Sequence, residues 1–402
     1  MQNISQLTPV VQEKTSAPDI LVISRVFLPK EGGIEEYAYN RCLQDPEKVI
    51  VLTGSYPGDK SFDQAQKFPV HRWFSLGAMK GGLVVSILKQ IVNMIGSFVM
   101  AIKLYFCYRY RYIEWLHGYD FPSILLLSYL LPIRYFFYVH GDEAICPLHN
   151  PLLHWLFQLT LQRAETVVAN SQFTQDLLKE KFDFDTPTQI IHPVVRPEKF
   201  GVALTPENLD NLGRSIRQKH NIPESATVIL SVARLVKRKG IDRVIENLTL
   251  LLAQGLDVHY IVCGRGAMES ELKSLTRRLN LEDRVHFAGY VPDNELAGYY
   301  AACDIFAMLT FYDSKAGSIE GFGIVYAEAG YFGKPVIASP IGGVVDAVHH
   351  QENGLLVNPN SGYDTFQAFS SLCQDGELRQ RLGAKGKELA CRQTMHRILY
   401  SS

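Results

Sequence analysis

The sequence lacks paired cysteines, a net charge and a long uncharged apolar run. Its seven cysteines are odd in number and scattered, and no Cys-x-x-Cys pair occurs. This argues against a disulfide framework or a zinc site and favours a reducing cytosol. The net charge of −1 gives no reason to expect nucleic acid as a partner. Residues 1–18 are polar and hold no apolar core before a cleavage site, so we expect a flexible lead-in there and no signal peptide.

The most apolar stretch, residues 82–106, is interrupted by Lys89, Lys103 and two amides. Its uncharged window is shorter than the roughly 18 to 20 residues that cross a bilayer, so we predict no membrane-spanning helix. Residues 102–115 interleave basic and aromatic side chains, which suits a membrane surface. A core helix and strand with basic ends would have the same composition, and both interpretations stay open.

Strand-like and helix-like patterns alternate along the chain in two series. At 402 residues the chain is long enough for two domains. Apolar strands alternate with helical stretches from residue 19 and again from residue 227, which is typical of doubly wound parallel sheets. The polar stretch 196–226 indicates a linker and a lead-in helix. The sequence therefore predicts an α/β fold of two Rossmann-like domains, residues 19–200 and 201–402.

The stretch SIEGFGIVYAEAGYFG, from Ser318 to Gly333, carries two carboxylates, Glu320 and Glu328. A glycine-containing turn leads into an apolar run, which predicts a helix whose N-terminus favours phosphate. If both acids lay on this helix, their separation of eight positions would place them about 80° apart around its axis, so they could line one crevice. Most carboxylate pairs on helices instead face solvent. The two acids would also lie about 12 Å apart along the axis, too far for the paired carboxylates of a retaining hydrolase. We therefore assign no covalent nucleophile.

Three other segments place ligand-binding residue types after strands. The first strand ends in a Gly-Gly turn at Gly33, which permits close approach of a ligand but is more often a plain turn. A later strand ends at His140, at the edge where open α/β sheets bind ligands, although a lone histidine there is more often structural. Arg234 and Lys239 lie between a strand and a helix, where cations would meet a diphosphate, although basic clusters usually face solvent.

The segment Glu-Gly-Phe-Gly-Ile-Val-Tyr-Ala-Glu-Ala, followed by Gly-Lys-Pro-Val-Ile-Ala-Ser, resembles the donor-binding segment of retaining GT-B glycosyltransferases with a Glu-x7-Glu motif. These are glycosyltransferase family 4-like enzymes, and the chain resembles their phosphatidylinositol-mannoside mannosyltransferases. The resemblance covers nearly the whole chain and is strongest over residues 230–357. It implies the GT-B fold, in which two Rossmann-like domains face each other across a cleft.

The resemblance also implies a reaction. A mannose- or glucose-type hexose moves from a nucleotide-diphosphate sugar, such as GDP-mannose or UDP-glucose, to a lipid-linked or polysaccharide acceptor, with no metal or other cofactor. The cytoplasm is the expected location, with peripheral contact to the inner face of the membrane.

By the resemblance, Arg234 and Lys239 stabilise the departing diphosphate, Glu320 orients sugar hydroxyls and His140 contacts the transferred sugar. The donor-binding residues implied in the same way are Gly33, Gly264, Tyr290, Val291, Gly321, Phe322, Gly323, Ile324 and Glu328, of which Glu328 holds the ribose and the backbone at Tyr290 and Val291 meets the nucleobase.

Other functions remain as alternatives. A sugar-nucleotide isomerase or a phosphorylase shares the fold, but the phosphorylase needs a lysine-anchored pyridoxal site for which there is no signal. A dehydrogenase needs Gly-x-Gly-x-x-Gly after a strand and an acid about 20 residues later, a pattern that is absent. A non-catalytic scaffold that binds a sugar nucleotide or a membrane would not need the intact catalytic set. Residues 384–402 lack the aromatic-Ser-Trp-like pattern with which the family returns to the first domain, so we expect a short crossover.

Overall fold

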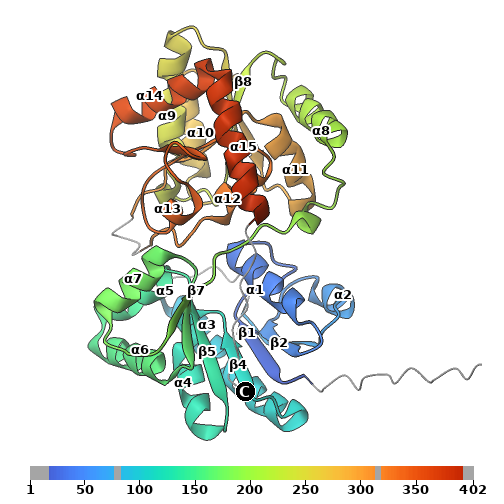
Figure 1. The fold of residues 1–402 in the computed structure, drawn as a ribbon, viewed down its shortest axis with the longest axis vertical. Helices are drawn as coiled ribbons and strands as arrows, with labels where there is room; N and C mark the ends of the chain where they lie inside the picture. Colours follow the sequence, from blue (N-terminus) through green and yellow to red (C-terminus); the bar gives the residue numbers. More distant parts are fainter. Residues whose placement is uncertain (1–17, 77–82, 313–317, 393–402) are drawn as a thin grey trace, which may run out of the picture.

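A computed structural model describes residues 18–76, 83–312 and 318–392, which form two α/β domains, one above the other in Figure 1. The expected lead-in, residues 1–18, lies outside the described residues except for Pro18. Residues 393–402, where the short crossover was expected, also lie outside them. The two predicted Rossmann-like sheets are confirmed.

The first domain is built on a seven-stranded sheet in the order β3-β2-β1-β4-β5-β6-β7, with every pairing parallel. Its central strands are buried on both faces, which explains why they read as continuous apolar runs. The order reverses between β1 and β4, and at such a switch point open α/β sheets bind ligands beyond the carboxyl ends of the strands. The strands are β1 (Ile20–Ser24), β2 (Val49–Gly54), β3 (Val70–Trp73), β4 (Tyr112–Trp115), β5 (Arg134–Val139), β6 (Thr166–Ala169) and β7 (Thr188–Ile190).

Helices cover both faces of this sheet. Side chains of α1, among them Tyr37 and Cys42, pack on one face. Helices α3, α4, α6 and α7 pack on the other face, where their side chains, among them Leu104, Ile124 and Phe157, are buried in the core. The helices are α1 (Gly33–Gln44), α2 (Asp59–Gln64), α3 (Leu83–Tyr108), α4 (Phe121–Leu130), α5 (Asp142–Ile145), α6 (Pro151–Arg163) and α7 (Gln172–Lys181), with short 3-10 turns η1 (Gly118–Asp120) and η2 (Cys146–His149).

The second domain repeats the plan with six parallel strands in the order β10-β9-β8-β11-β12-β13. Helices α9, α10 and α14 pack on one face, and α8, α11 and α12 on the other. The strands are β8 (Thr227–Val232), β9 (Val258–Cys263), β10 (Val285–Gly289), β11 (Ile305–Met308), β12 (Val336–Ala338) and β13 (Gly354–Leu356). The helices are α8 (Pro206–Lys219), α9 (Ile241–Ala253), α10 (Glu269–Arg278), α11 (Asp293–Ala302), α12 (Ile324–Tyr331), α13 (Val344–Ala347), α14 (Gly362–Gln374) and α15 (Gly376–Arg392), with η3 (Pro197–Phe200) and η4 (Lys237–Lys239).

Local sequence explains where several helices start. The side-chain oxygens of Asn150, Ser171, Thr205 and Ser361 each accept a hydrogen bond from backbone N–H groups of the first turn of α6, α7, α8 and α14. Such caps satisfy donors that have no partner inside the helix. In α6 and α8 the next residue is proline, whose fixed φ suits the first helical position.

The chain passes between the domains after β7. Phe200, in η3, is already buried in the core of the second domain. The first domain meets the second through residues that follow strands in both sheets. Asp142, after β5, accepts a hydrogen bond from the Ile319 N–H at 2.7 Å, and Asp346, after β12, accepts one from the Gln172 N–H at 2.6 Å. The carboxyl ends of the two sheets therefore face each other.

Two helices differ from expectation. We expected a helix that included both acids, but α12 starts at Ile324, and Glu320 lies in the preceding loop. Gly323, which caps α12, has a φ of 84°, a left-handed conformation that no right-handed helix continues through. The prediction that Glu320 and Glu328 share one helix is wrong, and the 80° and 12 Å spacings drawn from it do not apply.

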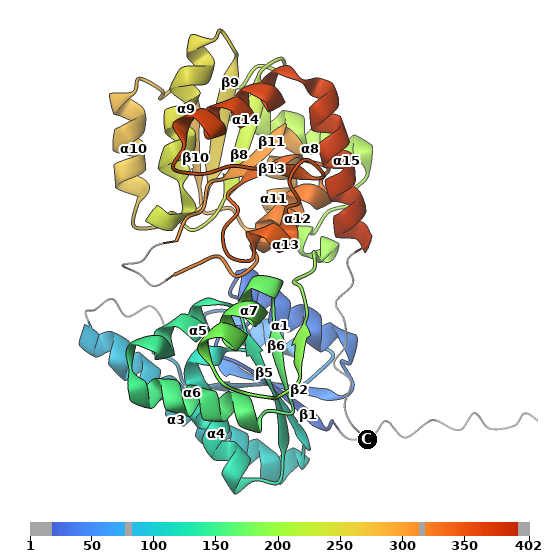
Figure 2. The same ribbon diagram turned by 60° about the vertical axis from the view of Figure 1, so that its left-hand side comes forward.

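The second difference is α3. Its lysines and amides do not interrupt it, and Val85–Tyr108 has the length and composition of a helix that can cross a membrane, with 17% of its most apolar window buried. The expected interruption of this segment is therefore wrong, whereas the prediction that no helix spans a membrane is not tested by length and composition alone and stays a prediction. Figure 2 shows α3 on the outer side of the first domain, beside α4 and α6.

Candidate active site

Residues 318–323, between β11 and α12, lie against the first domain. A Cβ at Gly321 would overlap the carbonyl oxygen of His140, so only glycine permits this approach. On its other side, a Cβ at Gly343 would overlap the carbonyl oxygen of Gly321. The loop is therefore held between the two domains by backbone contacts, and it brings Glu320 to their interface.

Glu320 is bound by cations of the loop between β8 and α9. Its Oε2 atom accepts hydrogen bonds from the Arg238 guanidinium, at 2.9 Å, and from the Lys239 ammonium. Burial acts to raise the pKa of Glu320, but the charges of Lys239 and Arg238 outweigh it and lower that pKa. Burial, with the charges of Arg238 and Arg234, lowers the pKa of Lys239 against the attraction of Glu320. The acid is thus an anion in a positively charged pocket.

Arg234 completes this group of positive charges. It follows β8, its side chain is exposed, and its charge acts on Lys239. Gly240, with a φ of 64°, begins α9 so close to the backbone of Leu309 that a Cβ there would overlap the Leu309 oxygen. The basic loop is thereby packed against the end of β11. Two of these cations pair with Glu320 and the third lies near Lys239, close to the N-terminus of α12, an arrangement that attracts an anion such as a diphosphate.

Glu328, on α12, is almost fully buried and both of its oxygens are bound. Lys199 donates to Oε1 at 2.6 Å and the Tyr300 hydroxyl donates to Oε2 at 2.8 Å. Burial acts to lower the pKa of Lys199, but Glu328 and Asp293 outweigh it and the pKa is raised. A ribose hydroxyl at Glu328 would therefore share the carboxylate with these protein donors.

His140 directly follows β5, on the first-domain side of the site. Its Nε2 lies 3.0 Å from the carbonyl oxygen of Leu116, which only accepts hydrogen bonds, so Nε2 carries the proton. In the neutral ring Nδ1 is then the acceptor. The amide of Asn170 donates to the His140 carbonyl oxygen at 3.2 Å and fixes the backbone that meets Gly321.

The loop after β1 reaches the second domain. A Cβ at Gly33 would lie 3.5 Å from the side chain of Ile324, so the N-termini of α1 and α12 are neighbours. Glu31 accepts a hydrogen bond from the Tyr290 hydroxyl. Burial, followed by the hydrogen bond to Glu31, raises the pKa of Tyr290. These contacts close the site on the β10 side.

The remaining predicted donor residues lie in the loop before α12 and in the loops that follow β9 and β10. Gly321 and Gly323 line the loop before α12, and the ring of Phe322 is buried 5.3 Å from that of His192. Val291 is buried in the core, so its side chain is not available to a ligand, and the predicted contact through its backbone stays a prediction. Gly264 has a φ of 137°, and a Cβ there would overlap the Ala233 carbonyl oxygen, so this glycine joins the loops after β8 and β9.

Sequence reasoning missed the partners of the two acids and the contacts that join the domains. Arg238 lies between Arg234 and Lys239 in the sequence, so its place in the same basic segment could have indicated a role at the site. Lys199 lies 129 positions from Glu328, and no local sequence pattern links the two residues. His117 and Glu143 were also missed. Each has a buried side-chain atom, Nδ1 and Oε1, without a hydrogen-bond partner in the part of the chain that the structure describes.

These two residues follow β4 and β5 at the same edge as His140. Burial, and then the charges of Arg25 and His140, lowers the pKa of His117 well below its usual value. Burial raises the pKa of Glu143. Buried polar atoms without partners are costly, and a bound hydroxyl would satisfy them.

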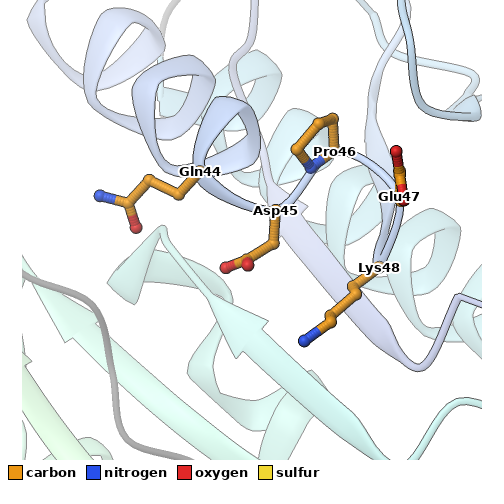
Figure 3. A pocket seen from close by; sticks show the side chains of 5 residues that line it. All are labelled: Gln44, Asp45, Pro46, Glu47 and Lys48. Atoms are coloured by element: carbon orange, nitrogen blue, oxygen red, sulfur yellow. The ribbon is translucent and has the colours of Figure 1, made fainter.

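A surface hollow of about 240 Å³ lies elsewhere. It is lined by Gln44, Asp45, Pro46, Glu47 and Lys48, between the end of α1 and the start of β2 (Figure 3). Since α1 starts at the interdomain site and runs away from it, this hollow lies at the opposite edge of the first sheet and belongs to no part of the site.

The comparisons with known proteins agree with this arrangement. Residues 31–199 match the family model of Glycosyltransferase Family 4, and residues 214–389 match that of glycosyl transferases group 1. The chain belongs to the GT4-like glycosyltransferases. The two matched regions coincide with the two domains.

Among curated relatives, this glycosyltransferase is 32% identical over 253 residues to the GDP-mannose-dependent alpha-(1-6)-phosphatidylinositol monomannoside mannosyltransferase of Mycobacterium tuberculosis. That match covers 62% of the chain and 63% of the relative. A GDP-mannose-dependent monoacylated alpha-(1-6)-phosphatidylinositol monomannoside mannosyltransferase of Corynebacterium glutamicum is 26% identical over 380 residues, or 91% of this chain and 92% of its own.

Solved structures with the same fold include Anabaena HepE in complex with UDP and glucose, at a TM-score of 0.74 and 21% identity, covering 94% of this chain and 95% of that one. Sucrose-phosphate synthase from Thermosynechococcus elongatus has a TM-score of 0.76 at 20% identity, with 94% of each chain covered. The predicted GT-B fold is confirmed.

Proposed function

We propose that this glycosyltransferase is a retaining hexosyltransferase, which moves a hexose from a nucleotide-diphosphate sugar to a hydroxyl of a lipid-linked or glycan acceptor without a metal. The observation that supports this is the pairing of Glu320 with Arg238 and Lys239 at the interdomain face, beside the N-terminus of α12 and against His140. The arrangement of charges at this point suits a donor with an anionic diphosphate and a polyhydroxylated sugar.

The diphosphate of a bound donor would replace Glu320 as the partner of Arg238 and Lys239. In the structure, Glu320 balances the charge of Arg238 and Lys239. A diphosphate arriving at Arg234, Arg238 and Lys239 supplies that negative charge instead and releases Glu320 to accept hydrogen bonds from sugar hydroxyls. Preorganised donors aimed at developing charge are usually the largest contribution to catalysis.

The reaction needs no covalent nucleophile from the protein. The bond between the anomeric carbon and the diphosphate oxygen breaks, and its electron pair goes to the diphosphate, which the three cations and the α12 N–H groups stabilise. The acceptor oxygen bonds to the anomeric carbon on the same face, and its proton passes to the departing phosphate oxygen. The configuration is retained. Glu320 and Glu328 are each tied to their own cations, which does not favour a nucleophilic carboxylate pair.

The names of the relatives bear on the substrates. Both mannosyltransferases are named as dependent on GDP-mannose and as acting on phosphatidylinositol mannosides. We therefore favour GDP-mannose over UDP-glucose as the donor, and a lipid-linked acceptor over a soluble glycan. We further propose a cytoplasmic location at the inner face of the membrane, since all seven cysteines are free, as expected in a reducing compartment.

The test begins with donor binding. Thermal unfolding is followed with GDP-mannose, UDP-glucose and the corresponding ADP-sugar, because a ligand that binds the folded state raises its stability with occupancy. Transfer is then measured from the donor that binds to a short-chain, water-soluble phosphatidylinositol mannoside. Transfer with retained configuration supports the proposal. Epimerised donor without transfer would identify an isomerase, and binding without any turnover would identify a scaffold.

A further inference from the structure

The outer surface of the first domain, over α3, α4 and α6, is apolar. Among the described residues, 11 of the 19 exposed large hydrophobic side chains lie on these three helices. On α3 they include Ile87, Ile91, Ile95 and Val99, which recur every four positions and so form one stripe along the helix. Exposed apolar patches of this extent mark binding surfaces in soluble proteins.

This stripe is not the side on which α3 packs. The inner side carries small and polar residues that fit the core. The Trp73 indole N–H donates to Asn93 at 2.9 Å, and a Cβ at Gly96 would lie 2.7 Å from the Trp73 ring. Ala101 and Leu104 are buried on the same side. Because α3 is fixed to the domain along its length, it lies on the domain surface and does not act as a separate membrane-crossing segment.

The neighbouring helices extend the surface. α4 packs against both α3 and α6, and the three lie side by side in Figure 2. Leu126 and Leu130 on α4 and Trp155 on α6 are each about half exposed. Tryptophan is enriched where a protein meets the boundary between lipid headgroups and acyl chains.

The charged side chains on these three helices all have one sign. No aspartate or glutamate occurs in α3, α4 or α6. Lys103, Arg109 and Arg163 are exposed on them or at their ends. The Arg109 guanidinium lies 5.4 Å from the Phe106 ring centre, and that of Arg163 lies 3.8 Å from the Tyr129 ring centre. Basic groups beside aromatic rings, next to an apolar stripe, are typical of helices that lie in the interface of an anionic bilayer.

We propose that the α3–α4–α6 surface docks on an anionic lipid bilayer, with the helices in the plane of the interface and the α3 stripe and Trp155 entering the acyl boundary. Two copies of the chain are a poorer occupant, since each would bring the same exposed cations and no acids to the contact.

The surface also adjoins the active site, and in this respect the proposal rests on the proposed function. Gln90, on α3, donates to the Tyr119 carbonyl oxygen at 2.9 Å and to Asp120 at 3.1 Å, and Asp120 pairs with Arg25 after β1. These residues lie at the edge of the sheet that carries His140. Docking would therefore hold a lipid-linked acceptor beside the site.

The experiment is vesicle flotation of the full chain without donor or acceptor. Vesicles contain 30% phosphatidylglycerol in phosphatidylcholine, with pure phosphatidylcholine for comparison. The wild type is expected to float with the anionic vesicles, and Ile95→Asp to bind them at least tenfold less. Tyr363→Asp is the matched control, because Tyr363 is exposed on α14 of the other domain, and it should float like the wild type. Lys103→Gln should weaken binding to anionic vesicles severalfold.

Native fluorescence gives an independent readout. Trp73 and Trp115 are buried and only Trp155 is exposed. Brominated lipids should quench part of the wild-type emission, and Trp155→Phe should abolish the quenching. The proposal is overturned if the wild type does not float, if Ile95→Asp and Tyr363→Asp behave alike, or if binding survives alkaline carbonate, which indicates a spanning helix. A dimer lost in Ile95→Asp without vesicle binding would overturn it in favour of a second copy.

The outcome is separable from that of the proposed function. Transfer to the water-soluble acceptor without flotation would refute docking alone. Flotation without transfer would refute the transferase and leave the docking surface standing.

Discussion

Replacing Glu320 with glutamine tests whether this carboxylate and a donor diphosphate compete for the same cations. Its Oε2 accepts from Arg238 at 2.9 Å and from Lys239, and its side chain is 13% exposed. Hydrogen bonds to charged groups contribute about 1.5 to 3 kcal/mol. Glutamine keeps a neutral acceptor but removes the charge, so we expect the donor-free cations to lose about 1.5 kcal/mol of stabilisation.

A diphosphate regains this stabilisation when it binds. The free nucleoside diphosphate should therefore bind Glu320→Gln about tenfold more tightly than the wild type, since 1.4 kcal/mol corresponds to tenfold in Kd. Transfer should change in the opposite direction, with kcat/KM falling about 10²-fold or more, because the sugar hydroxyls lose their anionic acceptor. Tight product binding would lower kcat further.

Isothermal titration with GDP and UDP measures the first effect, and a transfer assay at saturating acceptor measures the second. Glu269→Gln is the control, because Glu269 forms a comparable ion pair with Lys273, at 2.7 Å, on the surface of α10. It should leave both quantities unchanged. Weaker diphosphate binding in Glu320→Gln, with an unaltered unfolding temperature, would refute the exchange of partners.

Three further predictions follow from the site. Lys239→Ala should lower kcat for transfer by about 10²- to 10³-fold, while its circular dichroism spectrum stays that of the wild type. A kcat within fivefold of the wild-type value would refute its role. His117→Phe should raise the acceptor KM without changing diphosphate binding, whereas equal loss of both would indicate a structural role. Burial, then nearby carboxylates, raises the pKa of Asp293 from 3.8 to about 6 against the opposing charge of Lys199. The folded state therefore holds this proton more tightly than the unfolded state, and the stability it contributes is greatest below pH 3.8 and is lost as the pH rises through 6. Asp293→Asn should then stabilise the protein at pH 8, by about 1 to 2 kcal/mol after allowance for partial exposure, and not at pH 3, below the unfolded-state pKa; equal effects at both pH values in thermal unfolding would contradict this.

The fold could be predicted because most central strands are apolar runs between polar breaks. Strands such as β1, β5 and β8 are buried on both faces, so the sequence marks them without ambiguity. α3 was harder. A 26-residue helix with one packed side and one exposed apolar side has nearly the composition of a spanning helix, and only the position of Trp73 distinguishes the two.

The site was predictable where its residues are close in sequence. Glu320 and its loop, and the cations between β8 and α9, each belong to one short segment. The pairing of Lys199 with Glu328 and the contact of Asp142 with Ile319 depend on how the domains dock, which no local pattern encodes. The turn that opens α12 was expected at Gly321 to Gly323, but helical spacing was wrongly extended back to Glu320, which lies in the loop before that turn.

The contacts that join the domains also bear on how the donor is received. Gly321 leaves no space against His140, and the Gly343 N–H donates to the Glu320 carbonyl oxygen at 2.9 Å, so the loop that carries Glu320 is held by backbone contacts from both domains. Lys239 and Arg238, by contrast, belong to the second domain. When a diphosphate takes over these cations, the ion pair that ties the loop to them is released, while the bond from Ile319 to Asp142 remains. On the proposed mechanism, donor binding would free the Glu320 side chain from its cations while backbone contacts from both domains still hold its loop, so the sugar would be oriented by a residue that lies where the two domains meet.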